Sequence, residues 1–259
     1  MLSRLRPLLL LPLAALAACG SGSPSVPANS STPPAGDYVI TVAAGTSKSS
    51  YFSGDLAVSG NSVSGVFRYT NLGTICVSSG QDIAFTGNFG NNVLTLTSAS
   101  FAGSVATFTI NLPVGATSNG TQVANGSAVI TGGSCALTST TAQAQYIPSL
   151  SGTWSGAMTG TSSGTASITL TESAANSDGQ FPVTGAASFN STACNFSLPI
   201  STPLSGLLSG GQLSISSSDS SIGISANATT SPVAFSLTLN QSAEVPASCA
   251  GSYSGNLTN

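Results

Sequence analysis

An alternation of apolar and hydroxyl side chains runs through most of the chain after residue 35 and limits its possible folds more than any other feature. The clearest example is Ser167-Ile168-Thr169-Leu170-Thr171, in which the two kinds of residue take alternate positions. The same pattern recurs around residues 93–97, 213–216 and 235–239. Because successive side chains of a β-strand point to opposite faces, this period of two predicts half-buried strands. No window keeps the spacing of an amphipathic helix.

Glycine, serine and asparagine interrupt these strands at short intervals. Gly90-Asn91-Asn92 and Gly210-Gly211 lie between strand-like segments and suit hairpin turns that need positive φ. Short strands in local order predict an all-β fold of antiparallel meanders, which would close into barrels. Immunoglobulin-like sandwiches are the alternative, but the single tryptophan, Trp154, precedes Cys194 instead of lying between two cysteines.

The sequence after the first 35 residues is organised as an internal repeat. Two similar short stretches, at residues 63–66 and 183–186, each precede a cysteine. In both cases a second cysteine follows the first after about 55–60 residues. This repeat predicts two tandem β units, at residues 36–148 and 149–259.

The four cysteines of these units are expected to form disulfides. An even number of cysteines in an exported protein favours disulfides over thiolate metal ligands. The repeat favours one bridge in each unit, Cys76–Cys135 and Cys194–Cys249. A metal site of four thiolates is the alternative, but the sequence has no Cys-x-x-Cys pair. We therefore expect no metal and no cofactor.

The amino-terminal segment has the features of an export signal. Arg4 and Arg6 precede an apolar stretch at residues 8–16, which is too short to span a bilayer as a helix. The segment Leu16-Ala17-Ala18-Cys19 follows and resembles the lipobox of bacterial lipoproteins. This resemblance implies cleavage before Cys19 and acylation of that cysteine.

The lipobox resemblance also implies a location and a partner. Residues 1–18 would be the signal peptide, and residues 19–35 would be the lipidated cysteine followed by a flexible tether rich in Gly, Ser and Pro. Membrane lipid would be the partner, through acylated Cys19. We expect the protein in the bacterial cell envelope, at the outer membrane, on its periplasmic or its surface face.

Only 4% of the residues are charged, and this excludes several functions. Four Lys and Arg residues are too few to neutralise a nucleic-acid backbone, so no nucleic-acid partner is expected. The chain has no histidine, which excludes a His-based catalytic triad. We therefore predict that the protein is not an enzyme. The alternative is an enzyme that acts on envelope polysaccharide with a pair of its seven Asp and Glu side chains.

Three aromatic residues are candidates for ligand contacts: Phe67, Tyr69 and Trp154. Phe67 and Tyr69 would share one strand face and could stack on sugar rings, although core packing is the favoured role for such rings, because aromatics supply most of the area available for burial. The sequence thus predicts a lipid-anchored envelope protein with a non-enzymatic binding or structural role. In one version a small apolar ligand occupies a barrel, and in the other the hydroxyl-rich exterior is an adhesive or spacer surface.

Overall fold

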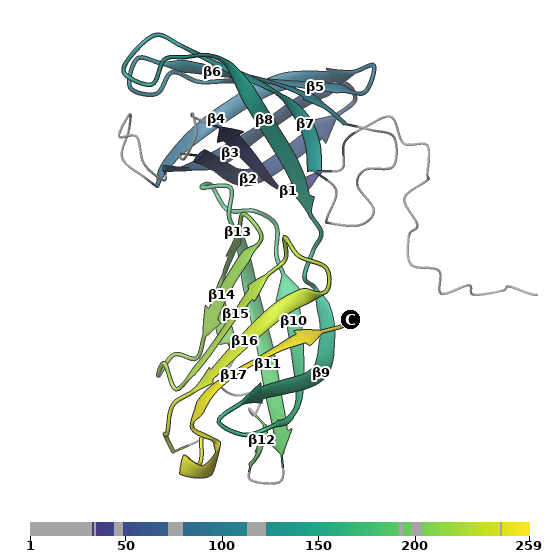
Figure 1. Cartoon of the computed structure of the whole chain (residues 1–259), viewed down its shortest axis with the longest axis vertical. Coiled ribbons are helices and arrows are strands. Elements are labelled where there is room, and N and C mark those ends of the chain that lie inside the picture. Colours follow the sequence, from purple (N-terminus) through teal and green to yellow (C-terminus); the bar gives the residue numbers. More distant parts are fainter. Residues whose placement is uncertain are drawn as a thin grey trace, which may run out of the picture.

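The fold is almost entirely β and consists of two barrels in tandem (Figure 1). The computed structural model describes residues 33, 35–43, 49–71, 80–112, 123–191, 194–197, 204–243 and 245–259. Every strand pairs with its neighbours in the antiparallel sense, and consecutive strands are mostly joined by hairpins. The predicted all-β fold of antiparallel meanders that close into barrels is confirmed.

The first barrel is a closed ring of eight strands in sequence order. The ring closes because β1 pairs with β2 on one side and with β8 on the other. Its strands are β1 (Gly36–Ala43), β2 (Ser49–Ser59), β3 (Ser62–Asn71), β4 (Gln81–Gly90), β5 (Val93–Ser98), β6 (Val105–Asn111), β7 (Val123–Thr131) and β8 (Leu137–Ile147).

The second barrel repeats this arrangement. Its ring closes through pairing of β9 with β17 and of β10 with β11, while the short β12 pairs with one end of β11. The immunoglobulin-like alternative is therefore wrong. The strands are β9 (Gly152–Gly160), β10 (Gly164–Glu172), β11 (Phe181–Ser191), β12 (Asn195–Ser197), β13 (Leu204–Ser209), β14 (Gln212–Ser216), β15 (Ile222–Asn227), β16 (Val233–Leu239) and β17 (Gly251–Leu257); a 3-10 turn, η1, covers Ala247–Cys249.

Two of the described cysteines, Cys135 and Cys249, lie at corresponding places in the two barrels, which supports the predicted internal repeat. Cys194 follows β11 and is bonded to Cys249, which precedes β17, so this predicted disulfide is confirmed. Cys135 lies at the corresponding place before β8 and is also disulfide-bonded. Its predicted partner, Cys76, lies outside the described residues.

Aromatic rings fill the interior of the first barrel. Phe52, Phe85 and Phe108 come from three alternate strands and meet with ring centroids 5.1–5.8 Å apart. Tyr69 packs on Phe52, and Phe67 packs on Phe85. Because these rings are almost fully buried, the barrel interior is a packed core.

The second barrel has a separate core of aliphatic side chains with fewer rings. Phe189 and Tyr253 pack with centroids 4.4 Å apart, and the Tyr253 hydroxyl donates a hydrogen bond to the carbonyl of Cys249. The described part of the chain contains no helix of the length and apolar character needed to cross a membrane.

Candidate functional site

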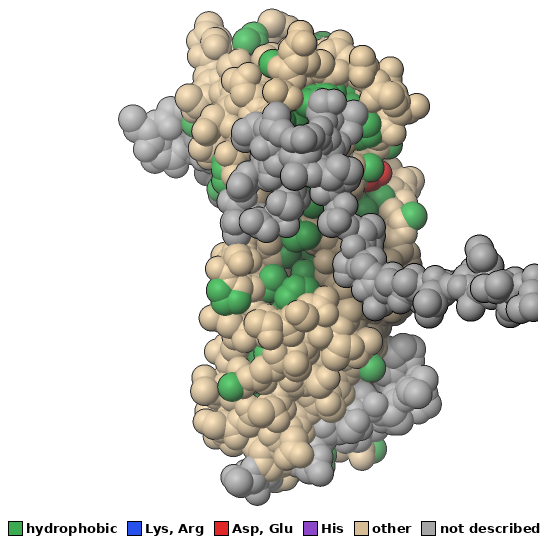
Figure 2. Space-filling model, turned by 90° about the vertical axis from the view of Figure 1, so that its right-hand side faces the viewer, with side chains coloured by type: hydrophobic (Ala, Val, Ile, Leu, Met, Phe, Trp, Pro, Cys, Tyr) green, Lys and Arg blue, Asp and Glu red, His purple; other side chains and the backbone are tan. Residues whose placement is uncertain are grey.

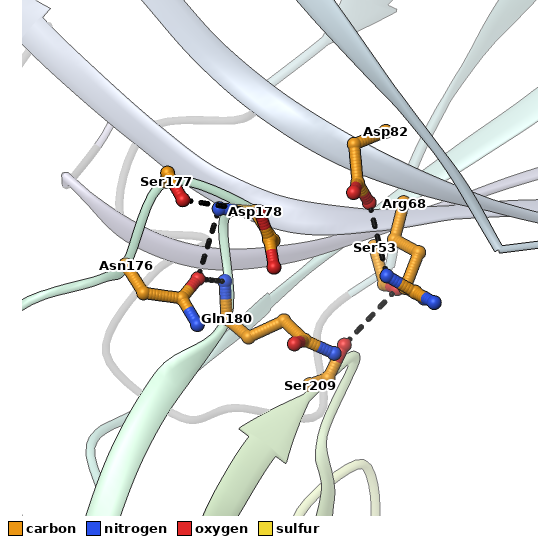
Figure 3. Close-up of polar contacts among 8 residues, drawn as sticks. All are labelled: Ser53, Arg68, Asp82, Asn176, Ser177, Asp178, Gln180 and Ser209. Atoms are coloured by element: carbon orange, nitrogen blue, oxygen red, sulfur yellow. Dashed lines mark hydrogen bonds and ion pairs between the residues drawn. The ribbon is translucent and has the colours of Figure 1, made fainter.

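The two barrels meet at a seam, where turns of the second barrel lie against the outer face of β1, β2 and β8 (Figure 1). At the β13–β14 turn, the Ser209 hydroxyl lies 3.5 Å from that of Ser53 on β2 (Figure 3). The side-chain amide of Gln145 on β8 donates a hydrogen bond of 3.0 Å to the carbonyl of Thr229. The polar contacts of the seam are thus made mostly by neutral groups.

The barrels also meet at the loop between β10 and β11, where a glycine allows the loop to lie close to β3. Gly179 has φ +70°, and a Cβ atom placed there would lie 2.0 Å from the carbonyl oxygen of Val66 on β3. The Asn176 side chain accepts hydrogen bonds from the backbone N–H groups of Asp178 and Gln180, which holds this loop in a turn (Figure 3). No other residue type would fit at position 179 without moving the backbone.

Asp37 is the buried carboxyl group of the seam. Its position on β1 places the side chain on the outer face of the first barrel, yet only 3% of the residue is exposed. One carboxyl oxygen, Oδ2, accepts a hydrogen bond of 3.2 Å from the backbone N–H of Gly211, at the β13–β14 turn. The other, Oδ1, has no hydrogen-bond partner.

Two further acids lie near Asp37. Asp55 is its direct cross-strand partner on β2, and Glu172 lies at the end of β10. The Glu172 carboxylate accepts hydrogen bonds from the Leu150 N–H and the Ser149 hydroxyl, which holds it beside the segment that links the barrels. Like charges directly opposite on neighbouring strands are destabilising, so this arrangement disfavours full ionisation.

The surroundings of these three acids raise the pKa of each of them. The pKa of Asp37 is raised to about 7, chiefly by burial; Glu172 and Asp55 contribute to the rise, while the N–H groups of Gly211 and Gly210 oppose it. Burial also raises the pKa of Asp55 and of Glu172. At neutral pH the Asp37 carboxyl therefore holds a proton for part of the time.

The seam acids differ from a polysaccharide-cleaving pair in one respect. Such a pair must contact substrate on both sides of the scissile bond. Asp55 lines a shallow cleft of about 350 Å³ beside the loop of Asn176, but Asp37 lies beneath the β13–β14 turn and does not line that cleft. The geometry suits Asp37 to holding a proton inside the molecule.

A row of polar side chains crosses the exterior of the first barrel. Its members are direct cross-strand partners from β3 to β8, one residue per strand, and all lie on the outward side. Their side chains are hydroxyls with one carboxamide. The first row consists of Ser62, Asn88, Thr95, Thr109, Ser127 and Thr141.

The second barrel has a corresponding row, made of hydroxyls alone. Its members are exposed cross-strand partners on five neighbouring strands: Ser214, Ser225, Ser236, Ser254 and Thr159. No hydrogen bond to another protein group is found for the side chains of either row among the described residues. Figure 2 shows a face of the molecule on which very few side chains are charged.

The three aromatic candidates do not form a stacking platform on the surface, which was one of the roles considered from the sequence. Phe67 and Tyr69 share one face of β3, as predicted, but this face is the inner one, and they are 1% and 2% exposed. Trp154 is half-buried against Phe235, and its indole N–H donates a hydrogen bond of 2.8 Å to the carbonyl of Leu150. All three rings therefore contribute to packing.

The remaining predicted site residue, Cys19, lies outside the described residues. Among the described residues, no group of three or more Cys, Asp or Glu side chains is arranged to hold a metal ion. Asp37 was not predicted as a site residue, because its burial depends on a turn 174 residues away along the chain. The rows could have been anticipated from the alternation of apolar and hydroxyl residues, although their register could not.

Comparison with known proteins yielded no match to a protein family, to a curated protein or to a solved structure.

Proposed function

We propose that this chain is a lipid-anchored protein of the bacterial cell envelope whose two barrels bind neutral polysaccharide through their outer surfaces, without catalysis. The observation that carries the proposal is the pair of in-register rows, which place unpaired polar groups on neighbouring strands of each barrel. The packed cores favour this surface role over an apolar ligand inside a barrel.

The chemistry of the rows fits a hydroxyl-rich polymer. A hydroxyl group both donates and accepts hydrogen bonds, so it can pair with a sugar hydroxyl in either sense. Neighbouring strands lie about 4.8 Å apart, which gives each row a regular step along its length. Only 4% of the residues are charged, and Arg68, the one cation among the described residues, is paired with Asp82. This scarcity of charge favours a neutral polymer over an anionic one.

The test is retention of the full chain on insoluble neutral polysaccharides, with glucan, mannan and chitin as probes and an anionic polygalacturonate for comparison. Thr95→Val with Thr109→Val removes two hydroxyls from the first row, and Ser225→Ala with Ser236→Ala does so in the second. Each lost hydrogen bond is worth about 0.5–1.5 kcal/mol, so we expect each double variant to bind at least about fivefold more weakly.

Thr171→Val is the matched control, because Thr171 is an exposed strand residue that belongs to neither row. It should bind like the unaltered chain. The proposal is wrong if the unaltered chain binds none of the neutral polymers, or if both double variants bind as strongly as the control.

A further inference from the structure

We propose that Asp37 is a proton-controlled latch between the two barrels, which holds the seam closed when its carboxyl group is protonated and weakens the seam when it is ionised. By latch we mean the Asp37 side chain together with the hydrogen bond that it accepts from the Gly211 N–H. This inference concerns the relative positions of the barrels and does not depend on what the outer surfaces bind.

The position of Asp37 makes its charge costly only while the barrels are docked. The residue lies on the outer face of β1, so the second barrel provides the cover that leaves it 3% exposed. One hydrogen bond reaches Oδ2, and Oδ1 has none. An ionised carboxylate with an unpaired buried oxygen is far less favourable than a neutral acid in the same place. Separation of the barrels would return the group to water.

The charged groups around the latch do not offset this cost. Asp55 on β2 and Glu172 on β10 are both acidic and raise the pKa of Asp37 further. From the neighbouring β8, Tyr146 contributes a phenol whose own pKa is raised by burial and by Glu172 and Asp37. Tyr38, next to Asp37 on β1, belongs to the first core instead. The β13–β14 turn contributes Ser209, Gly210, Gly211 and Gln212, none of which is ionisable.

The one Lys or Arg side chain among the described residues is already paired. Arg68 on β3 forms an ion pair of 3.2 Å with Asp82 (Figure 3). The loop between β10 and β11 contributes Asp178, which is acidic and partly exposed. The seam as described thus has acids facing Asp37 and no cation bonded to it.

The direction of the pH effect follows from the change in pKa on docking. Asp37 titrates near 3.8 in water and at about 7 in the docked molecule. Docking is therefore strongest below about pH 4, weakens as the pH rises to about 7 and changes little above that. The second core reaches across the seam to Ile147 of β8 and Val39 of β1, so opening the seam exposes these two side chains. The first core consists of first-barrel residues alone, and most of the second core lies within the second barrel, so the seam can open while each barrel stays folded.

Nuclear magnetic resonance of the full chain tests the latch directly. The Asp37 carboxyl carbon and the Gly211 amide should titrate together, with a midpoint near pH 7. Hydrogen exchange of the Gly211 amide, corrected for intrinsic exchange, should become about a hundredfold faster between pH 4.5 and pH 7.5. Amides of the barrel cores should not follow this change.

Asp37→Asn keeps an oxygen that can accept the Gly211 N–H but cannot ionise. We expect corrected exchange of Gly211 in this variant to be slow and independent of pH. Asp178→Asn is the matched control, because it removes a partly exposed acid of the seam loop, and it should keep the pH dependence of the unaltered chain.

The proposal is overturned if Asp37→Asn and the unaltered chain show the same pH dependence of Gly211 exchange. A titration of the Asp37 carbon near pH 4 in the unaltered chain would overturn it independently, even if the variant fails to fold.

Discussion

Single glycines determine how closely the barrels approach each other. At Gly179 a methyl group would overlap the Val66 carbonyl, whereas at Gly60 a methyl group would have no neighbour within 4 Å. Both residues have positive φ, +70° and +59°, so the cost of that backbone conformation is common to both positions. The two glycines therefore allow steric exclusion at the seam to be separated from backbone strain.

We expect Gly60→Ala to lower the free energy of unfolding by about 1–2 kcal/mol, which is the cost of a left-handed conformation for alanine. Gly179→Ala should carry the same cost and should also displace the loop from β3. Urea unfolding compares the two losses, and exchange of the Gly211 amide reports on the seam. If the two variants have the same seam exchange, Gly179 does not control the contact.

A second prediction at the residue scale concerns the acids around Asp37. Removal of a nearby negative charge stabilises the ionised form, so Glu172→Gln and Asp55→Asn should both lower the pKa of Asp37 from about 7. The effect of Glu172→Gln should be the larger, because Glu172 raises that pKa more than Asp55 does. The titration midpoint of the Asp37 carboxyl carbon measures both changes, and an unchanged midpoint in both variants would contradict the prediction.

At the scale of elements, the strands were predictable and the buried acid was not. Alternation of apolar and hydroxyl residues is local, so it predicted segments such as 167–171 and 235–239, which lie within β10 and β16. The matching cysteine spacing predicted the bridge of Cys194 with Cys249. Burial of Asp37 depends instead on how one barrel covers another, and no local pattern encodes that contact.

The disulfide of the second barrel is expected to contribute a large part of that barrel's stability. It joins residues 55 positions apart. Closing a loop of this length lowers the conformational entropy of the unfolded chain, which stabilises the folded state by about 4 kcal/mol. Cys194→Ser with Cys249→Ser should lower the free energy of unfolding of the second barrel by about that amount. Exchange of buried amides in β16 measures this loss.

Amides of β6 provide the internal control, since they belong to the separate core of the first barrel. Equal acceleration of exchange in β6 and β16 would mean that the two barrels unfold as one unit, contrary to this expectation.

At the scale of the whole molecule, closure of both sheets compensates for the scarcity of charge. Exposed sheet edges invite pairing with other chains, and many proteins protect them with lysine. This chain has four Lys and Arg residues in all, and two of them, Arg4 and Arg6, belong to the predicted signal peptide. Ring closure removes the edges except at the short β12, and the outward hydroxyls supply contacts with water.

The anchoring prediction also belongs to this scale. If Cys19 is acylated, Cys19→Ala should move the protein from the membrane fraction to the soluble fraction, because acyl chains supply the membrane affinity. Fractionation of cells followed by detection of the chain measures the change. A serine elsewhere in the tether, Ser21→Ala, is the matched control and should stay with the membrane. Membrane association that survives Cys19→Ala would refute the acylation.

The start of β1 beside the seam has a mechanical consequence. Gly36 begins β1 one residue before Asp37, so a tether that ends at residue 35 would be attached beside the seam between the barrels. If Cys19 is anchored in a membrane, attachment between the barrels would hold neither barrel nearer to the lipid than the other. Both exteriors would then face a surrounding polymer at similar heights, within the roughly 20–25 Å reach of the tether.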